Sequence, residues 1–113
     1  MEEKRKSRRR HLLAEVRIRP EGSGWIEAVL MNINRGGIGL YAMQPLKQKD
    51  RVEIRITYLE HAELKTVEEI PGVVRWVQPI GKHHAAGIMF AEKVTKRNFP
   101  VLSRCLDYAR TGD

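Results

Sequence analysis

The chain has 113 residues, of which 42% are hydrophobic, and this length and composition suit one domain with a modest core. Lysine and arginine outnumber aspartate and glutamate by 21 to 14, and the resulting formal charge of +7 favours partners that carry phosphate groups. A single cysteine, Cys105, excludes an intramolecular disulfide and a thiolate metal site within one chain, and no apolar run approaches membrane-spanning length, so we expect a cytoplasmic protein without membrane insertion.

The first ten residues, MEEKRKSRRR, contain no apolar residue after Met1 and therefore cannot form a buried element by themselves. We expect residues 1–10 to be a flexible basic segment and residues 11–113 to form the folded domain. From residue 12 onward apolar side chains recur with period two up to Ile18, which predicts a first strand with one face exposed to solvent.

Five further segments have the composition of short strands, being rich in β-branched and aromatic residues or containing glycines that allow close approach. They cover residues 25–31, 37–42, 51–58, 72–77 and 85–90. Because no helical pattern separates the six strands, we expect antiparallel pairing, and a small sheet of this kind usually closes on itself to hide its edges. The sequence therefore predicts an all-β fold, a six-stranded antiparallel β-barrel.

The last segment changes period, because its apolar residues are three or four positions apart. They are Phe99, Leu102, Leu106 and Ala109. This spacing predicts an amphipathic C-terminal α-helix over about residues 98–110, with Asn98 as its N-cap.

Two polar features fall at strand boundaries, the basic run KRKSRRR at residues 4–10 and the turn NINRGG at residues 32–37. The run directly precedes the first predicted strand and the turn joins the second to the third, so a barrel could bring them together. Guanidinium groups can fork onto phosphate oxygens, bind guanine bidentately or stack on a base, and asparagine amides add donors and acceptors for base edges. The two features together indicate a cationic site for a phosphate-bearing purine ligand.

Taken in order, these motifs resemble those of the PilZ domain family. RKSRR at residues 5–9 matches the family's RxxxR motif, and NINRGG at residues 32–37 is close to its D/N-x-S-x-x-G motif. Residues 72–77 and 86–90 look like the family's later strands, so the resemblance covers nearly the whole chain. It implies a PilZ-like split barrel that binds cyclic di-GMP as a bacterial second-messenger receptor, without catalysis or a cofactor, and that acts on a downstream effector protein.

Carried over position by position, the resemblance also implies the ligand-binding residues. They are Arg5, Arg8, Arg9, Arg10, Asn32, Asn34, Gly37 and Trp76. Arg5 and Arg9 would be the main clamp on phosphate and guanine, although Lys6 and Arg10 have the same spacing. Asn34 stands where the motif has serine, and it keeps a donor and an acceptor in a longer side chain.

Plainer interpretations of the same residues stay open. The basic run could be a solvated tail, the NINRGG turn could simply join two strands with its amides bonded to local backbone, and tryptophan in a strand, such as Trp76, is more often core. The chain could then be a PilZ-like protein-interaction module that has lost nucleotide binding, or a small barrel that binds nucleic acid without selectivity. Nucleic acid ranks below the nucleotide, because aromatic content of 6% leaves few rings for stacking bases. His83 and His84 are adjacent on a predicted strand and cannot easily share a metal.

Overall fold

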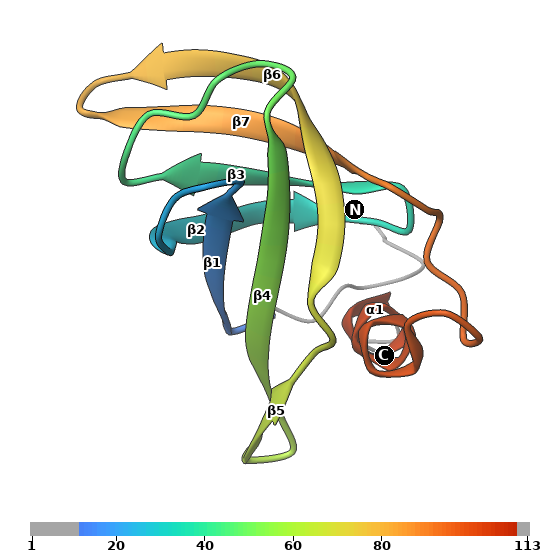
Figure 1. Ribbon diagram of the computed structural model, residues 1–113. Coiled ribbons are helices and arrows are strands. Elements are labelled where there is room, and N and C mark those ends of the chain that lie inside the picture. The colour runs from blue at the N-terminus through green and yellow to red at the C-terminus, as the bar shows by residue number, and fades with distance from the viewer. Residues whose placement is uncertain (1–11, 111–113) are drawn as a thin grey trace, which may run out of the picture.

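The computed structural model describes residues 12–110. Its elements are β1 (Ala14–Pro20), β2 (Ile26–Ile33), β3 (Gly37–Ala42), β4 (Arg51–Glu60), β5 (Glu63–Thr66), β6 (Ile70–Ile80), β7 (His83–Phe90) and α1 (Pro100–Arg110). All strand pairings are antiparallel, in the order β1-β2-β3-β7-β6-β4-β5, and a further pairing between β1 and β4 closes six of the strands into a barrel (Figure 1). The predicted six-stranded antiparallel barrel with a C-terminal helix is confirmed.

The extra strand β5 was not predicted, because only four residues form it and three of them are exposed. It returns along the end of β4 through a two-residue turn in which His61 and Ala62 both have positive φ, at 51° and 67°. Turns of this kind usually contain Asn-Gly or Asp-Gly, which lower the cost of positive φ. A His-Ala pair gives no such signal, so the sequence offers no sign of the hairpin.

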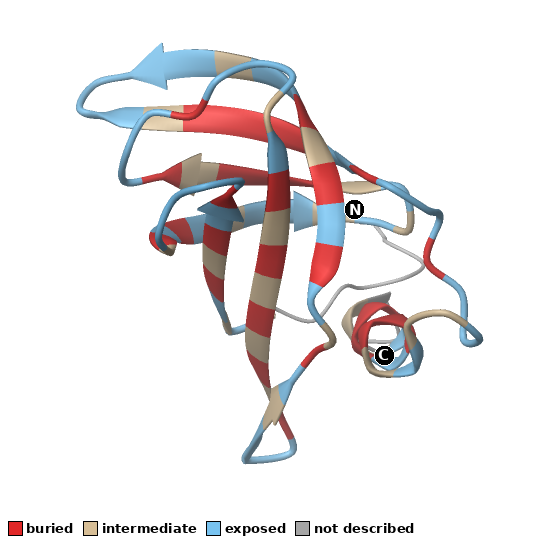
Figure 2. Ribbon diagram, viewed as in Figure 1, coloured by how far each residue is buried: buried red, intermediate tan, exposed pale blue. Residues whose placement is uncertain are grey.

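The barrel interior follows from period-two alternation, most clearly along β4. Val52, Ile54, Ile56 and Tyr58 are buried in the core, and the residues between them are partly exposed (Figure 2). The buried apolar stripe of α1 joins the same core, so the helix packs onto the barrel as one further layer. Among the described residues, no helix has the length and apolar character needed to cross a bilayer.

The beginning of α1 corrects the expectation that Asn98 is the N-cap. The backbone N–H groups of Val101 and Leu102 instead donate to the carboxylate of Glu68, at 2.8 and 3.0 Å, and a negative charge at this end suits the helix dipole. Asn98 belongs to the turn before the helix, where its Oδ1 accepts from the N–H of Thr95 and its own N–H donates to the Thr95 Oγ1. The two side chains satisfy each other's backbone, as in a capping box.

Candidate functional site

Two glycines face each other on the outer surface of the barrel, Gly39 of β3 and Gly87 of β7. A Cβ atom at Gly39 would lie 2.9 Å from the Oδ1 of Asn32, and a Cβ atom at Gly87 would overlap the indole nitrogen of Trp76. The missing side chains therefore leave room for an amide and an indole directly on the sheet backbone. This glycine pair forms the floor of an open hollow of about 400 Å³.

A β-bulge on each side of the floor turns Asn32 and Trp76 outward. The register of β2 against β3 shifts between Leu30 and Asn32, and the register of β6 against β7 shifts between Val74 and Trp76. Leu30 and Val74 pack on the core, and in an unbroken strand the residue two positions later would face the core as well. The extra residue of each bulge reverses that alternation, so the side chains of Asn32 and Trp76 both lie on the outer face of the barrel.

All four predicted site residues within the described part of the chain line this one hollow. They are Asn32, Asn34, Gly37 and Trp76. Trp76 is 44% exposed, so the usual core position of a strand tryptophan does not apply here. Arg5, Arg8, Arg9 and Arg10 lie outside the described residues.

The turn between β2 and β3 is held by the amide of Asn34. Its Oδ1 accepts from the backbone N–H groups of Gly36 and Gly37, at 2.8 and 3.1 Å, and its own N–H donates to the Gly37 carbonyl at 3.0 Å. This is the local bonding of an Asx turn. Because Oδ1 is used within the turn and Nδ2 bonds to none of residues 12–110, Nδ2 is the donor that Asn34 offers to the hollow.

Gly37 is required by close packing of β3 against β7. A Cβ atom there would lie 2.5 Å from the backbone oxygen of Ile88, a distance that real Cβ atoms do not show. The next residue of the turn is also bonded to β7, because the N–H of Phe90 donates to the carbonyl of Gly36 at 2.9 Å. Glycine at this motif position therefore sets where the turn meets the sheet.

Two side chains that the motifs did not indicate complete the hollow, Arg75 and Met89. Arg75 is the extra residue of the β6 bulge, and its Nη1 lies 3.1 Å from the Sδ of Met89, which is 45% exposed. Arg75 adds a positive charge beside Trp76, and Met89 adds an apolar side chain. Only knowledge of the bulge would have placed Arg75 and Trp76 at one site, because neighbours on a regular strand point to opposite faces.

The hollow thus combines an exposed indole, amide donors and a cation on a flat backbone floor, a set suited to stacking and hydrogen bonding with an anionic base-bearing ligand. Among residues 12–110, no group of three or more histidine, cysteine, aspartate or glutamate side chains could hold a metal ion.

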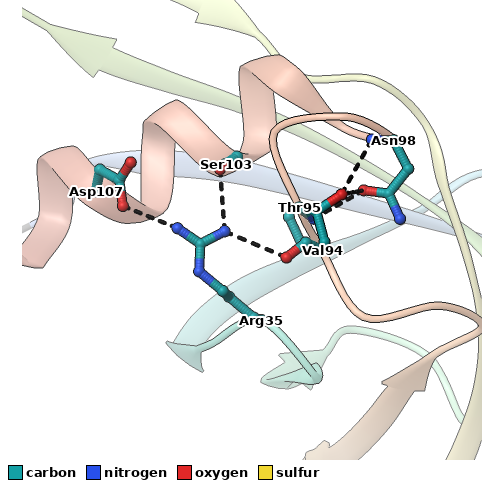
Figure 3. A network of polar contacts seen from close by, with 6 residues as sticks. All are labelled: Arg35, Val94, Thr95, Asn98, Ser103 and Asp107. Carbon is teal, nitrogen blue, oxygen red and sulfur yellow. Dashed lines mark hydrogen bonds and ion pairs between the residues drawn. The ribbon is translucent and has the colours of Figure 1, made fainter.

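Arg35, in the middle of the same turn, extends toward α1 (Figure 3). Its Nη1 donates to the Oγ of Ser103 at 3.0 Å and to the carbonyl of Val94 at 3.3 Å. Its Nη2 pairs with the carboxylate of Asp107 at 2.8 Å. Nothing in the sequence separates Arg35 from the basic residues that are expected to meet a ligand, because the position of α1 beside the turn is a property of the fold.

Comparison with known proteins identifies the family and the fold. Residues 3–108 match the family model of the PilZ domain. The solved structure of the Bacillus subtilis inhibitor of motility (MotI/DgrA) is similar with a TM-score of 0.63 and 20% identity, over 93% of this chain and 51% of that one. This chain therefore spans about half the length of that structure, and the likeness bears on the fold alone. Comparison with curated proteins finds no match. The chain belongs to the PilZ domain family, a family of non-catalytic receptors that typically bind cyclic di-GMP.

Proposed function

We propose that this protein is a receptor for cyclic di-GMP and binds the nucleotide in the hollow above the Gly39–Gly87 floor. The observation that carries the proposal is that two distant parts of the sequence, the NINRGG turn and the strand around Trp76, meet at this hollow. Two bulges and two glycines are needed to bring them there. Bulges often re-aim side chains beside functional sites.

Each group at the hollow has a role in this proposal. The exposed indole of Trp76 stacks on a guanine base, which contributes about 1–3 kcal/mol in comparable complexes. The amides of Asn32 and Asn34 bond to base edges or phosphate oxygens, and the guanidinium of Arg75 attracts phosphate. The glycine floor lets the Asn32 amide and the Trp76 indole lie close against the sheet, where both can contact the ligand.

The basic segment, residues 1–10, supplies the clamp in this proposal. Arg5 and Arg9 bind phosphate and the O6 and N7 atoms of guanine, and Arg8 and Arg10 add charge. Binding then favours one closed arrangement of the segment over the folded domain of residues 11–113. Nucleotide can act on a downstream effector protein only through such a difference in the surface presented.

Titration calorimetry with cyclic di-GMP in low-salt buffer tests the receptor. The wild-type chain is expected to bind, and the double variant Arg5→Ala with Arg9→Ala is expected to lose binding with an unchanged melting transition. The matched control is Lys96→Ala with Arg97→Ala, which removes the same charge from two exposed residues away from the hollow. Absence of binding by the wild type, or equal binding by the Arg5 and Arg9 variant, would contradict the proposal.

A protein-interaction module without nucleotide is the second candidate function, and the local bonding of Asn34 favours it, because the turn already uses the Oδ1 of Asn34. Asn34→Asp separates the two candidates. A carboxylate still accepts from both glycine N–H groups and keeps the turn, but it replaces the outward donor by an anionic acceptor. The receptor predicts loss of cyclic di-GMP binding at unchanged stability, whereas a module that acts without nucleotide has no nucleotide affinity to lose.

A further inference from the structure

The binding turn and helix α1 are joined through one side chain, Arg35 (Figure 3). The guanidinium is 31% exposed and has acceptors on two separate segments, α1 and the strand-to-helix connection. A charged donor with several acceptors, partly out of water, binds more strongly than an exposed surface ion pair. Releasing Arg35 would also leave the buried Ser103 hydroxyl without this partner, which is costly.

The main chain strengthens the same connection. The N–H of Val94 donates to the carbonyl of Arg35 at 2.9 Å, and Val94 is buried in the core just before the helix. Arg35 therefore contacts this connection with both its backbone and its side chain. Displacement of α1 would remove Ser103 and Asp107 from the guanidinium together, and the Arg35 side chain would keep only its longer bond to the Val94 carbonyl, at 3.3 Å.

We propose that Arg35 is the positioning residue of the binding turn, through which the seating of α1 on the barrel sets the affinity for nucleotide; this rests on the proposed function. With α1 seated, Arg35 fixes the turn so that the neighbouring Asn34 presents Nδ2 at the hollow. With Arg35 released, nucleotide must also order the turn, and that ordering lowers the affinity.

The coupling acts in both directions, as linkage between two binding equilibria requires. A nucleotide that binds better when α1 is seated must hold α1 in place by the same factor. The exposed side of α1, which carries Arg104 and Asp107, then reports whether the hollow is occupied. Arg35 does this without touching the nucleotide.

Hydrogen exchange of backbone amides in the ligand-free full chain provides the first measurement. Ser103→Ala changes only the helix side, yet we expect it to speed exchange at Gly36 and Gly37, in the turn, severalfold. Arg35→Met is expected to speed exchange both in the turn and along α1. The matched control is Arg55→Met, since Arg55 is similarly exposed and pairs with Glu69 at 2.6 Å elsewhere on the barrel.

Cyclic di-GMP provides the second measurement, made at a temperature where all variants are folded. Arg35→Met is expected to raise the Kd about tenfold, and the extra protection of α1 amides that nucleotide causes in the wild type is expected to disappear. Arg35→Lys, which keeps one cationic donor, is expected to restore part of both effects. A purely structural Arg35 would lower the melting temperature but leave Kd and the nucleotide-induced protection as in the wild type.

The two proposals fail differently. If the wild type binds nucleotide but Ser103→Ala and Arg35→Met leave exchange in the turn and the Kd unchanged, the coupling is wrong and the receptor stands. If the wild type does not bind cyclic di-GMP, the proposed function and the affinity coupling built on it both fall.

Discussion

The two tryptophans of the chain differ in what covers their rings. At Trp25 the guanidinium carbons of Arg19 and Arg55 lie 4.7 and 4.3 Å from the ring centroid. Both arginines also reach the carboxylate of Glu69, at 4.0 and 2.6 Å. The chain thus supplies its own cations to this ring, and the resulting cluster stabilises the outer surface of β1 and β4.

At Trp76 the ring lies on the glycine floor, and no cation among residues 12–110 covers it. The adjacent Arg75 contacts Met89 instead. An aromatic ring beside a guanidinium is present at both places, but among residues 12–110 the cations lie over the ring only at Trp25. Residue types alone therefore do not distinguish a binding site from a structural cluster. What distinguishes Trp76 from Trp25 is the β6 bulge, which directs the ring outward, and Gly87, which leaves room for it.

The largest effect is expected from closing the floor with Gly87→Ala. The new methyl group overlaps the Trp76 indole, which gives way because it is exposed, while the barrel stays folded. Losing the ring and the flat floor together should weaken cyclic di-GMP binding by about 3 kcal/mol, roughly a hundredfold. Calorimetry checks the affinity, and Gly24→Ala is the control because a Cβ at Gly24 meets nothing within 4 Å. Unchanged affinity in Gly87→Ala would show that nucleotide does not use the floor.

Removing each tryptophan in turn tests the comparison directly. Trp76→Ala should weaken nucleotide binding by about 2 kcal/mol, close to thirtyfold, and should destabilise the fold less than loss of a core tryptophan would, because Trp76 is on the outer face. Trp25→Ala should leave affinity unchanged and lower the free energy of unfolding by about 1–2 kcal/mol, since two cations lose their ring. Calorimetry and urea unfolding measure the two quantities. The reverse pattern would place the ligand at Trp25.

These differences show what a sequence can and cannot reveal about this chain. The alternation along β4 fixes its buried side directly, since each apolar position is two residues from the next. Alternation fails at Asn32 and Trp76, because one inserted residue moves a side chain to the other face and no local residue type announces the insertion. The motif resemblance chose both residues, whereas the reason that they meet is visible only in the strand register.

Long-range partners are the other limit. The cap of α1 comes from Glu68, which is distant in the sequence, although the residue type and position of Asn98 predict that Asn98 is the cap. Arg35 likewise looks like one more cation in a basic protein until α1 is placed beside it. Side chains whose partners are distant in sequence take their roles from the packing of elements, which periodicity cannot supply.

Alkaline pH tests the barrel core beneath both tryptophan sites, and its expected effect on the free energy of unfolding is smaller. Burial, and then the nearby Glu60 carboxylate, raises the pKa of the Cys105 thiol to about 12 from an ordinary value of 9.0. Because the folded state holds this proton more tightly, the stabilisation is complete below pH 9 and is lost as pH rises from 9 to about 12. Ionisation of Cys105 alone should lower the free energy of unfolding by about 1 kcal/mol at pH 10. Urea unfolding at pH 8 and 10 should show a smaller drop for Cys105→Ala, and an equal drop would mean that the thiol does not contribute.

The smallest effect is expected where the chain departs from its family's motif, at Asn34. In Asn34→Ser the hydroxyl can still accept from the turn glycines and can still donate, but it is shorter than the amide. Replacing one hydrogen bond by a similar one should change the affinity for cyclic di-GMP by about 0.7 kcal/mol, roughly threefold. Calorimetry on the wild type and Asn34→Ser decides the sign. A gain would mean that the motif serine suits the hollow better, and a loss would mean that Nδ2 of Asn34 reaches an acceptor that serine cannot. A change above about thirtyfold in either direction would contradict the view that the turn, held by its own local bonds, tolerates either residue.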